Sequence, residues 1–224
     1  MATALLVNRQ NSASSTLVFD DIDGRWVAVT VRSGECENIA TDVWAVFTLQ
    51  PRPDGTLSGE FIQASPRGCV TKQTPALTRT GDVDSSVQVA DPETQPPRLV
   101  SEAQGLHGRY HDTLNYADGY SLAQDEVVRT DCLRTGDRCM SLAYGADGVA
   151  ALVFANGKWT KGLENKSPCE AGGTALEKYT ADYALPLPPQ DPITVLTGRG
   201  HLEVIGTACA VGVDFDEKFE RTGD

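Results

Sequence analysis

One short phrase occurs twice in this chain: a tryptophan followed ten residues later by a cysteine. The copies span residues 26–36 and 159–169, and each follows an apolar triplet and a turn, Asp23-Gly24 in the first copy and Asn156-Gly157 in the second. A repeated unit constrains the architecture before any other feature does, because each copy must fold in a similar way. The phrase therefore predicts two related lobes.

The correspondence continues beyond the tryptophans. Cys69 is matched by Cys209, Trp44 is matched only by Tyr183, and the segment 79–82 has the same sequence as 221–224. The distance between the copies drifts along the chain, as expected if loops changed length while strands did not. Features present in both copies are expected to be structural, so Trp26 and Trp159 are interpreted as core residues.

Strand signals dominate both halves. The β-branched and aromatic runs include residues 26–32, 43–49, 56–62, 126–132, 138–144 and 149–154, separated by Gly, Asn and Asp turns. This pattern predicts an all-β fold made of two tandem sandwich- or barrel-like lobes. We place the first β lobe at residues 1–82, a polar linker at 83–100 and the second β lobe at 101–224. The S-x-x-Q spacing at Ser101 predicts one short helix around residues 102–108.

The six cysteines are predicted to form three disulfides. The repeat favours pairing within each copy, Cys36 with Cys69 and Cys169 with Cys209. Cys132 and Cys139 flank a hairpin turn at residues 135–136, which places them opposite each other. Zinc is a weaker alternative, because there is no C-x-x-C pair and the chain has only three histidines. Disulfides indicate an oxidising, extracytoplasmic location.

The charge of the chain argues against several partners. With 19 basic and 31 acidic residues the net charge is −12, which disfavours nucleic acid and an anionic membrane surface. No stretch is apolar enough to span a bilayer, and the first seven residues do not resemble a signal peptide. We therefore expect an excised domain that contacts a membrane only through an anchor outside this chain.

No motif predicts catalysis, a metal or a cofactor. Residues 19–24 look like a calcium loop, but the ligand spacing is wrong and the second copy has no carboxylate there, which favours a hairpin turn. His107 and His111 have i, i+4 spacing but no H-E-x-x-H context. Nucleophile elbows and phosphate-binding glycine loops are absent from the sequence. We expect a chain without catalytic residues, bound metal or cofactor.

Aromatic residues outside the shared frame are the candidates for ligand binding, because binding sites tend to occupy variable regions of a rigid scaffold. They gather mostly in the stretch 109–144, which has no counterpart in the first half. The candidates are Tyr110, Tyr116, Tyr120, Tyr144 and Trp44.

Residues 128–141 and 152–159 resemble the extracytoplasmic C-terminal domain of mycobacterial receptor-type serine/threonine protein kinases, and residues 106–111 and 188–193 strengthen the likeness. The likeness runs from about Pro97 to Asp224 and extends more loosely over the first copy. It implies a parent protein with an N-terminal kinase domain, one membrane helix and this sensor domain outside. In that family no catalytic residues are assigned to this part.

The leading interpretation is a non-enzymatic sensor that binds a cell-wall fragment, a small molecule or a protein outside the membrane. It would signal through lobe rearrangement or through a homodimer. One alternative is a secreted or lipid-anchored envelope binding protein without a kinase. A cell-wall hydrolase is a further alternative, and it would require a cleft with a carboxylate pair or an activated nucleophile.

Overall fold

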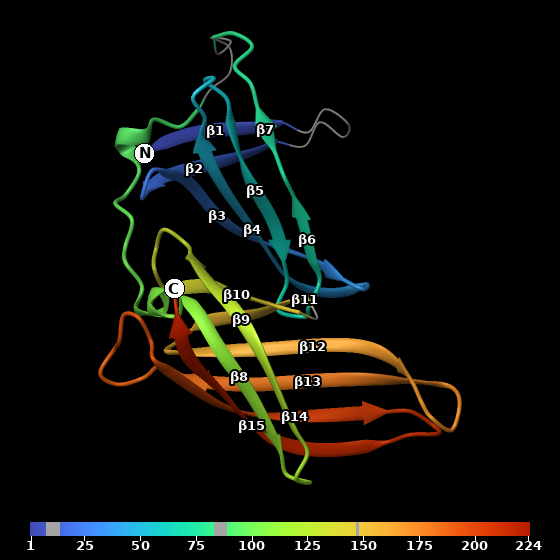
Figure 1. Cartoon of the computed structure of the whole chain (residues 1–224). Coiled ribbons are helices and arrows are strands. Elements are labelled where there is room, and N and C mark those ends of the chain that lie inside the picture. The colour runs from blue at the N-terminus through green and yellow to red at the C-terminus, as the bar shows by residue number, and fades with distance from the viewer. Residues whose placement is uncertain (8–13, 83–88, 147) are drawn as a thin grey trace.

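The computed structural model describes residues 1–7, 14–82, 89–146 and 148–224 and shows an all-β fold, as the sequence predicts (Figure 1). In the described residues, no helix is both long and apolar enough to cross a membrane. The strands of the first lobe are β1 (Ala2–Val7), β2 (Ser14–Ile22), β3 (Arg25–Cys36), β4 (Ile39–Pro51), β5 (Leu57–Ala64), β6 (Val70–Gln73) and β7 (Ala76–Leu77). Those of the second are β8 (Gly108–Tyr116), β9 (Ser121–Cys132), β10 (Arg138–Gly145), β11 (Gly148–Ala155), β12 (Lys158–Pro168), β13 (Thr174–Ala184), β14 (Val195–Ile205) and β15 (Val211–Gly223).

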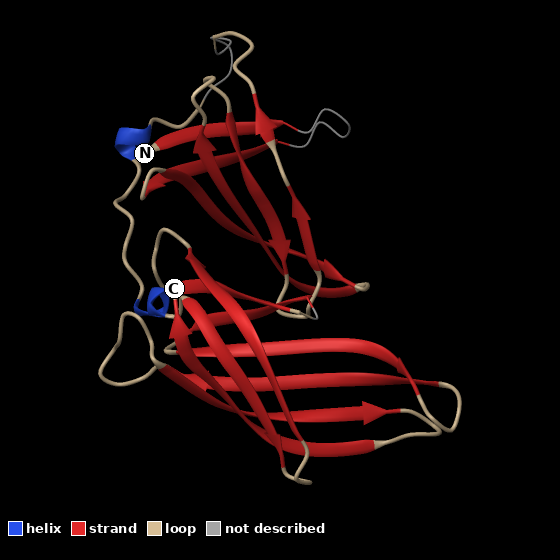
Figure 2. Ribbon diagram, viewed as in Figure 1, coloured by secondary structure: helices blue, strands red, loops and turns tan. Residues whose placement is uncertain are grey.

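The first lobe is one antiparallel sheet in the order β1-β2-β3-β4-β5-β6, with β7 also paired to β5. The second lobe is a closed antiparallel barrel in the order β10-β11-β12-β13-β14-β15-β8-β9 (Figure 2). In Figure 1 the sheet lies above the barrel, and the connecting segment runs along one side. The barrel leaves no free edge strand, because β15 pairs with β8 and β9 pairs with β10.

The two matched turns have the same backbone conformation. Asp23 and Gly24 have φ of 53° and 75°, and Asn156 and Gly157 have φ of 53° and 77°. Two-residue hairpin turns of this kind need positive φ at both positions, which Asn, Asp and Gly tolerate best. The segment that looks like a calcium loop is therefore a hairpin turn, in agreement with the sequence interpretation.

The two repeated segments of the sequence each fold into consecutive antiparallel strands, β2 to β6 in the sheet and β11 to β15 in the barrel. The side-chain register differs from the sequence match at one position. Trp26 pairs with Leu49, whereas Trp159 pairs with Tyr183, so Leu49 and not Trp44 is the structural counterpart of Tyr183. Trp26 and Leu49 are 23 positions apart and Trp159 and Tyr183 are 24 positions apart, so the position relative to the hairpin turn, and not residue similarity, sets this correspondence.

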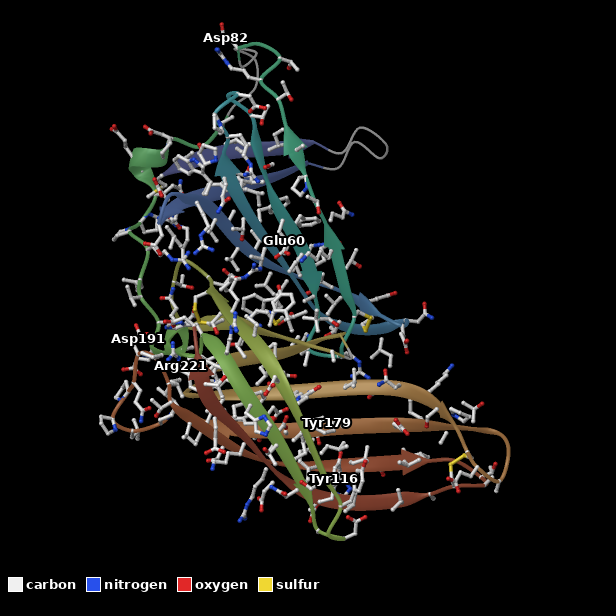
Figure 3. All side chains as sticks on the ribbon, viewed as in Figure 1. Glu60, Asp82, Tyr116, Tyr179, Asp191 and Arg221 are labelled. Atoms are coloured by element: carbon white, nitrogen blue, oxygen red, sulfur yellow. A yellow bond between two sulfur atoms is a disulfide. The ribbon has the colours of Figure 1, made fainter. Side chains whose placement is uncertain are left out.

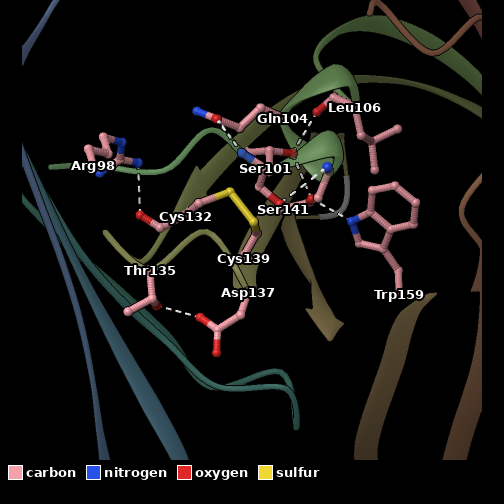
Figure 4. Close-up of a disulfide and its surroundings, with 12 residues drawn as sticks. Arg98, Ser101, Gln104, Leu106, Cys132, Thr135, Asp137, Cys139, Ser141 and Trp159 are labelled. Atoms are coloured by element: carbon pink, nitrogen blue, oxygen red, sulfur yellow. Dashed lines mark hydrogen bonds between the residues drawn. A yellow bond between two sulfur atoms is a disulfide. The ribbon is translucent and has the colours of Figure 1, made fainter. Parts of the chain in front are cut away.

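Three disulfides join the pairs that the sequence favours. Cys36–Cys69 and Cys169–Cys209 have Cα separations of 5.8 Å and 5.7 Å. Cys132 and Cys139 are direct partners across β9 and β10, with Cα atoms 3.9 Å apart (Figure 4), slightly closer than is usual for a disulfide. Each bridge lies within a single lobe.

One end of the barrel is closed. The predicted helix is a 3₁₀ turn, η2 (Glu102–Gly105), shorter than expected, with the predicted capping box between Ser101 and Gln104 (Figure 4). A second 3₁₀ turn, η1 (Pro92–Thr94), lies in the connecting segment. Ala103 and Leu106 are buried in the barrel core, and the amide of Ile193 donates to Gly105 O at 2.7 Å. These contacts close the end of the barrel that lies next to the connecting segment.

The lobes share an apolar core. On β10 and β11, alternate side chains face the barrel interior, and those between them face the first lobe. This interlobe cluster is made of Trp44, Ile62, Ala64, Met140, Leu142, Ala151 and Val153, all buried. The lobes are thus packed against each other by a hydrophobic layer.

Ion pairs surround the interlobe cluster. Glu60 accepts from Arg129 at 2.8 Å, and Asp20, itself buried, accepts from Arg98 and Arg134. The guanidinium of Arg138 lies 5.3 Å from the centre of the Trp44 ring. These contacts give Asp20 a structural role, because it ties the first hairpin to the connecting segment and to the β9–β10 turn.

Candidate ligand pocket in the barrel

A layer of charged side chains crosses the interior of the barrel. Asp112, Glu126 and Glu217 are buried, and Lys161 exposes only 11% of its side chain. Asp112 faces inward because it alternates on β8 with Tyr110 and Leu114, which belong to the barrel core. Tyr110 contacts Ile193 at the closed end of the barrel, so Asp112, two residues further along β8, lies farther from η2.

Glu217 is the best satisfied of the three acids. Lys161 Nζ donates to Glu217 Oε1 at 2.6 Å, and the hydroxyls of Tyr179 and Tyr183 both donate to Glu217 Oε2. Gly198 allows this arrangement, because a Cβ there would come within 2.2 Å of the Tyr183 ring. One lysine and two phenols thus neutralise and fix a single carboxylate.

The other two acids are left with free acceptor atoms. Gln124 donates to Glu126 Oε1 at 2.8 Å, but Glu126 Oε2 has no hydrogen-bond partner among the described residues. Neither carboxyl oxygen of Asp112 has a donor in the described chain, although a protonated Asp112 can donate to Glu217. A buried acceptor without a donor costs about 1–3 kcal/mol, so these atoms are unusual in a folded interior.

Burial and mutual repulsion shift the pKa values of the acids. Burial, followed by the charge of Glu217, raises the pKa of Asp112 to about 8. Burial also raises the pKa of Glu126, and the attraction of Lys161 offsets only part of this effect. Burial disfavours the charged form of Lys161, but the charge of Glu217, its hydrogen bond and the charges of Asp112 and Glu126 together outweigh burial and raise the lysine pKa. At neutral pH Asp112 is mostly protonated and Lys161 is charged.

A cavity of about 750 Å³ opens above this layer. Glu126 and Lys161 line its polar floor, and Tyr116 and Tyr179 line its wall. Figure 3 shows these two tyrosines near one another on the barrel. Residues of the first lobe also line the cavity, namely Gly68, Val70 and Lys72. The cavity therefore lies at the mouth of the barrel and is shared between the lobes.

The aromatic wall is internally packed. The rings of Tyr179 and Phe215 are stacked with centroids 4.5 Å apart, and Tyr116 lies 5.5 Å from Phe215. A Cβ at Gly200 would come within 2.0 Å of the Phe215 ring, so the glycine makes room for that ring inside the barrel. These contacts hold the wall of the cavity in place.

A second cavity of about 680 Å³ is lined largely by exposed side chains of the C-terminal strands. Its charged groups are already paired with one another: Arg199 donates to Asp216 at 3.1 Å, and His201 Nδ1 lies 2.6 Å from Asp214. Its lining leaves no buried polar group unsatisfied among the described residues. The shared cavity is therefore the better candidate for a ligand site.

The structure separates the five aromatic residues that the sequence proposed. Tyr116 lines the cavity, and Tyr120, which is exposed, lies beside it at a centroid distance of 5.9 Å. Tyr110 is buried near the closed end, where its hydroxyl donates to Ile193 O at 2.7 Å. Trp44 and Tyr144 pack in the interlobe cluster. The structure therefore places Tyr116 in the cavity lining with Tyr120 next to it, and the other three elsewhere.

The charged members of the pocket were missed by the sequence analysis. A signal for them exists, because Asp112 alternates with Tyr110 and Leu114, and alternation on a strand places all three on one face. A carboxyl group on an apolar strand face is a functional candidate in its own right. Lys161, two residues after the core residue Trp159, follows the same pattern.

The histidines contact single carboxylates near the surface. His107 lies 2.9 Å from Asp191, and His111 lies 2.8 Å from Asp125. Within the part of the chain that the structure describes, no group of three or more His, Cys, Asp or Glu residues is arranged to hold a metal ion.

Part of the chain matches a known family. Residues 2–94 match the PknI serine/threonine-protein kinase sensor domain. The match covers less than half of the chain and supports a sensor domain of a PknI-type kinase in this region, which confirms the resemblance to receptor-kinase sensor domains. A sensor domain is non-catalytic, in agreement with the expectation that this domain is not an enzyme. The matched lobe is the one over which the resemblance was looser.

A comparison with curated proteins gives no match. Among solved structures, the crystal structure of a DUF3598-family protein of unknown function from Nostoc punctiforme is similar over 87% of this chain and 88% of that chain, with 9% sequence identity and a TM-score of 0.29.

Proposed function

We propose that this chain is the extracytoplasmic, ligand-binding sensor region of a receptor-type serine/threonine protein kinase, and that its ligand enters the cavity at the barrel mouth. The match of the first lobe to a kinase sensor domain supports the signalling role. The three disulfides support a location in an oxidising compartment. The parent protein would supply the kinase domain and the membrane anchor.

The shared cavity is the observation that carries the proposal. A molecule bound between the barrel mouth and the segment around Val70 contacts both lobes. Its affinity then depends on how the lobes are oriented, and a ligand can shift a conformational equilibrium only through such a difference in affinity. A change in lobe orientation, or in homodimerisation, would carry the signal to the kinase.

The arrangement of the acids favours binding over hydrolysis. Of the three buried carboxyl groups, Glu126 alone lines the cavity, and Glu217 is held by Lys161 and two phenols. A glycoside hydrolase needs two carboxyl groups on either side of the bond to be cleaved. Of these acids, the cavity is lined by a single carboxyl group, that of Glu126.

Blocking the cavity tests the ligand site. Ala150 lines the cavity and is only partly buried, so Ala150→Phe is expected to fill the space. Wild-type chain incubated with a digest of bacterial cell wall, washed and denatured, should release bound small molecules that mass spectrometry detects. The Ala150→Phe variant should release none, whereas Ala184→Phe, at an exposed position on β13, should behave like wild type. Equal capture by all three proteins would contradict the proposal.

The kinase link is tested in the full-length receptor that carries this domain, reconstituted in vesicles with the sensor outside. The captured fraction should change autophosphorylation at least several-fold in the wild-type receptor and should leave the Ala150→Phe receptor unchanged. An identical response in both receptors would mean that the cavity does not transmit the signal.

A further inference from the structure

The cavity floor presents an acceptor without a donor. Glu126 is 4% exposed, it lines the cavity, and its Oε2 atom has no hydrogen-bond partner among the described residues. Its other oxygen is held by Gln124, which orients the carboxyl group. A ligand that brings an N–H or O–H group to Oε2 would satisfy this atom, and a charged donor would do so more strongly than a neutral one.

The cations of the cavity are already occupied. Lys161 is paired with Glu217, and Lys72 is paired with Glu60. An anionic ligand would therefore have to compete with these carboxylates, and it would also approach Glu126. Because Lys161 is paired with Glu217, Glu126 is the lining carboxyl group without a cationic partner among the described residues, so the electrostatic field at the cavity favours positive charge.

The wall of the cavity suits the same kind of ligand. Tyr116 and Tyr179 line it, and their ring faces attract cations through the ring quadrupole. Tyr179 is already stacked on Phe215 and has Lys161 Nζ 5.1 Å from its ring centre, so Tyr116 is the ring better placed to meet a further cation. Aromatic rings beside a carboxylate are a common recognition pattern for organic ammonium groups.

We propose that the cavity selects a small organic molecule with a positively charged amine, whose ammonium group binds Glu126 beside the rings of Tyr116 and Tyr179. This inference rests on the proposed function, because it names the ligand class of the same cavity. The remainder of the ligand would contact the apolar side chains at the barrel mouth, among them Leu114 and Leu122.

Three probes of matched shape test the charge preference: benzylammonium, benzyl alcohol and benzoate, each titrated at neutral pH into the full ¹⁵N-labelled chain. Benzylammonium should bind most tightly and should shift the amide signals of Glu126, Tyr116 and Tyr179. Benzyl alcohol should bind more weakly and benzoate most weakly. Binding of benzoate or benzyl alcohol at the same amides with equal or higher affinity would overturn the ammonium class but leave the cavity as a ligand site.

Single-residue variants test whether Glu126 and Tyr116 cause the preference for benzylammonium. Glu126→Gln keeps the shape of the side chain and removes its charge, so benzylammonium affinity should fall about 10-fold or more, as expected for the loss of a charge-assisted hydrogen bond. Asp125→Asn, the neighbouring position with an exposed side chain, is the matched control and should leave the affinity unchanged. Tyr116→Leu provides a second test if Glu126→Gln fails to fold, and it should weaken benzylammonium binding more than benzyl alcohol binding.

Two outcomes separate the inference from the proposed function. Unchanged benzylammonium affinity in folded Glu126→Gln, or no binding of benzylammonium to the wild-type chain, would overturn the inference. Only the failure of Ala150→Phe to block capture from the cell-wall digest would overturn the cavity itself as the sensor site.

Discussion

Asp112 shows how the barrel accommodates an acid in its interior. Its two oxygens have no donor among the described residues, and burial together with Glu217 raises its pKa to about 8. The groups that face it are Glu217, Lys161 and Glu126. Protonation removes the charge that would otherwise have to be buried near Glu217, so the folded state binds a proton there that the unfolded chain does not.

This protonation predicts a pH dependence of stability. The unfolded-state pKa of an aspartate is about 3.9, below the folded value, so between these pH values the folded state holds more protons. The free energy of unfolding should therefore fall as the pH rises from 5 to 8, by up to about 1.4 kcal/mol per pH unit for one proton. Urea unfolding of Asp112→Asn should show a flatter dependence over this range, and an equally steep fall in that variant would contradict the assignment.

Trp44 is a core residue of the lobe interface and not a free aromatic surface. It is fully buried, and Arg138 covers its ring. Trp44→Ala should lower the free energy of unfolding by about 3–5 kcal/mol, the usual cost of removing a large buried aromatic side chain. Tyr120→Ala, at a position 59% exposed, should change it by less than about 0.5 kcal/mol, and chemical denaturation of both variants compares them. Similar costs for both would contradict this placement of Trp44.

The hairpins are the elements that the sequence predicts best. Asp23-Gly24 and Asn156-Gly157 specify their turns through local backbone chemistry, and the cysteines on either side of residues 135–136 lie on paired strands. Closure of the barrel could not be read in the same way, because the pairing of β15 with β8 joins segments about a hundred residues apart, for which no local pattern exists. The register of Trp44 was missed because the position relative to the hairpin turn, and not residue similarity, sets strand pairing.

The candidate site was predicted only in part. The search for aromatic residues outside the repeat found Tyr116, which lines the cavity, and Tyr120, whose ring lies beside that of Tyr116. It did not find Glu126 or Lys161, because charged residues on strands are usually solvent-exposed and only the closed barrel turns these two inward.

The disulfides should stabilise the fold according to the length of the loop that each one closes. Replacing both members of Cys169–Cys209 by serine should cost about 3–4 kcal/mol, against about 2.5 kcal/mol for Cys132–Cys139, because the longer loop loses more chain entropy on closure. Thermal unfolding of the two double variants under non-reducing conditions makes the comparison. A larger loss for the Cys132–Cys139 variant would show that native packing, and not loop entropy, dominates there.

The whole molecule depends on contacts between the sheet and the barrel. Burial raises the pKa of Glu60, but hydrogen bonds from Lys72 and Arg129 outweigh it, so the net shift is downward. The contact of Glu60 with Arg129 joins the lobes at 2.8 Å. A charged pair at a partly buried interface can therefore couple the two lobes.

A double-mutant cycle measures this coupling. Glu60→Gln, Arg129→Met and the double variant should give an interaction free energy of about 0.5–3 kcal/mol in urea unfolding. The exposed pair Lys158–Asp182, which lies within the barrel, is the control and should give less than about 1 kcal/mol. A coupling near zero for the first pair would mean that this ion pair does not help to hold the lobes together.

None of the three disulfides crosses from one lobe to the other, so apart from the connecting segment the lobes are held by packing and ion pairs. The covalent link between the lobes should then be dispensable for their association. Residues 1–94 and 95–224, secreted as two separate polypeptides, should find each other and co-purify as a heterodimer. The two lobes would thus behave as the fragments of a split protein, which associate without a covalent link.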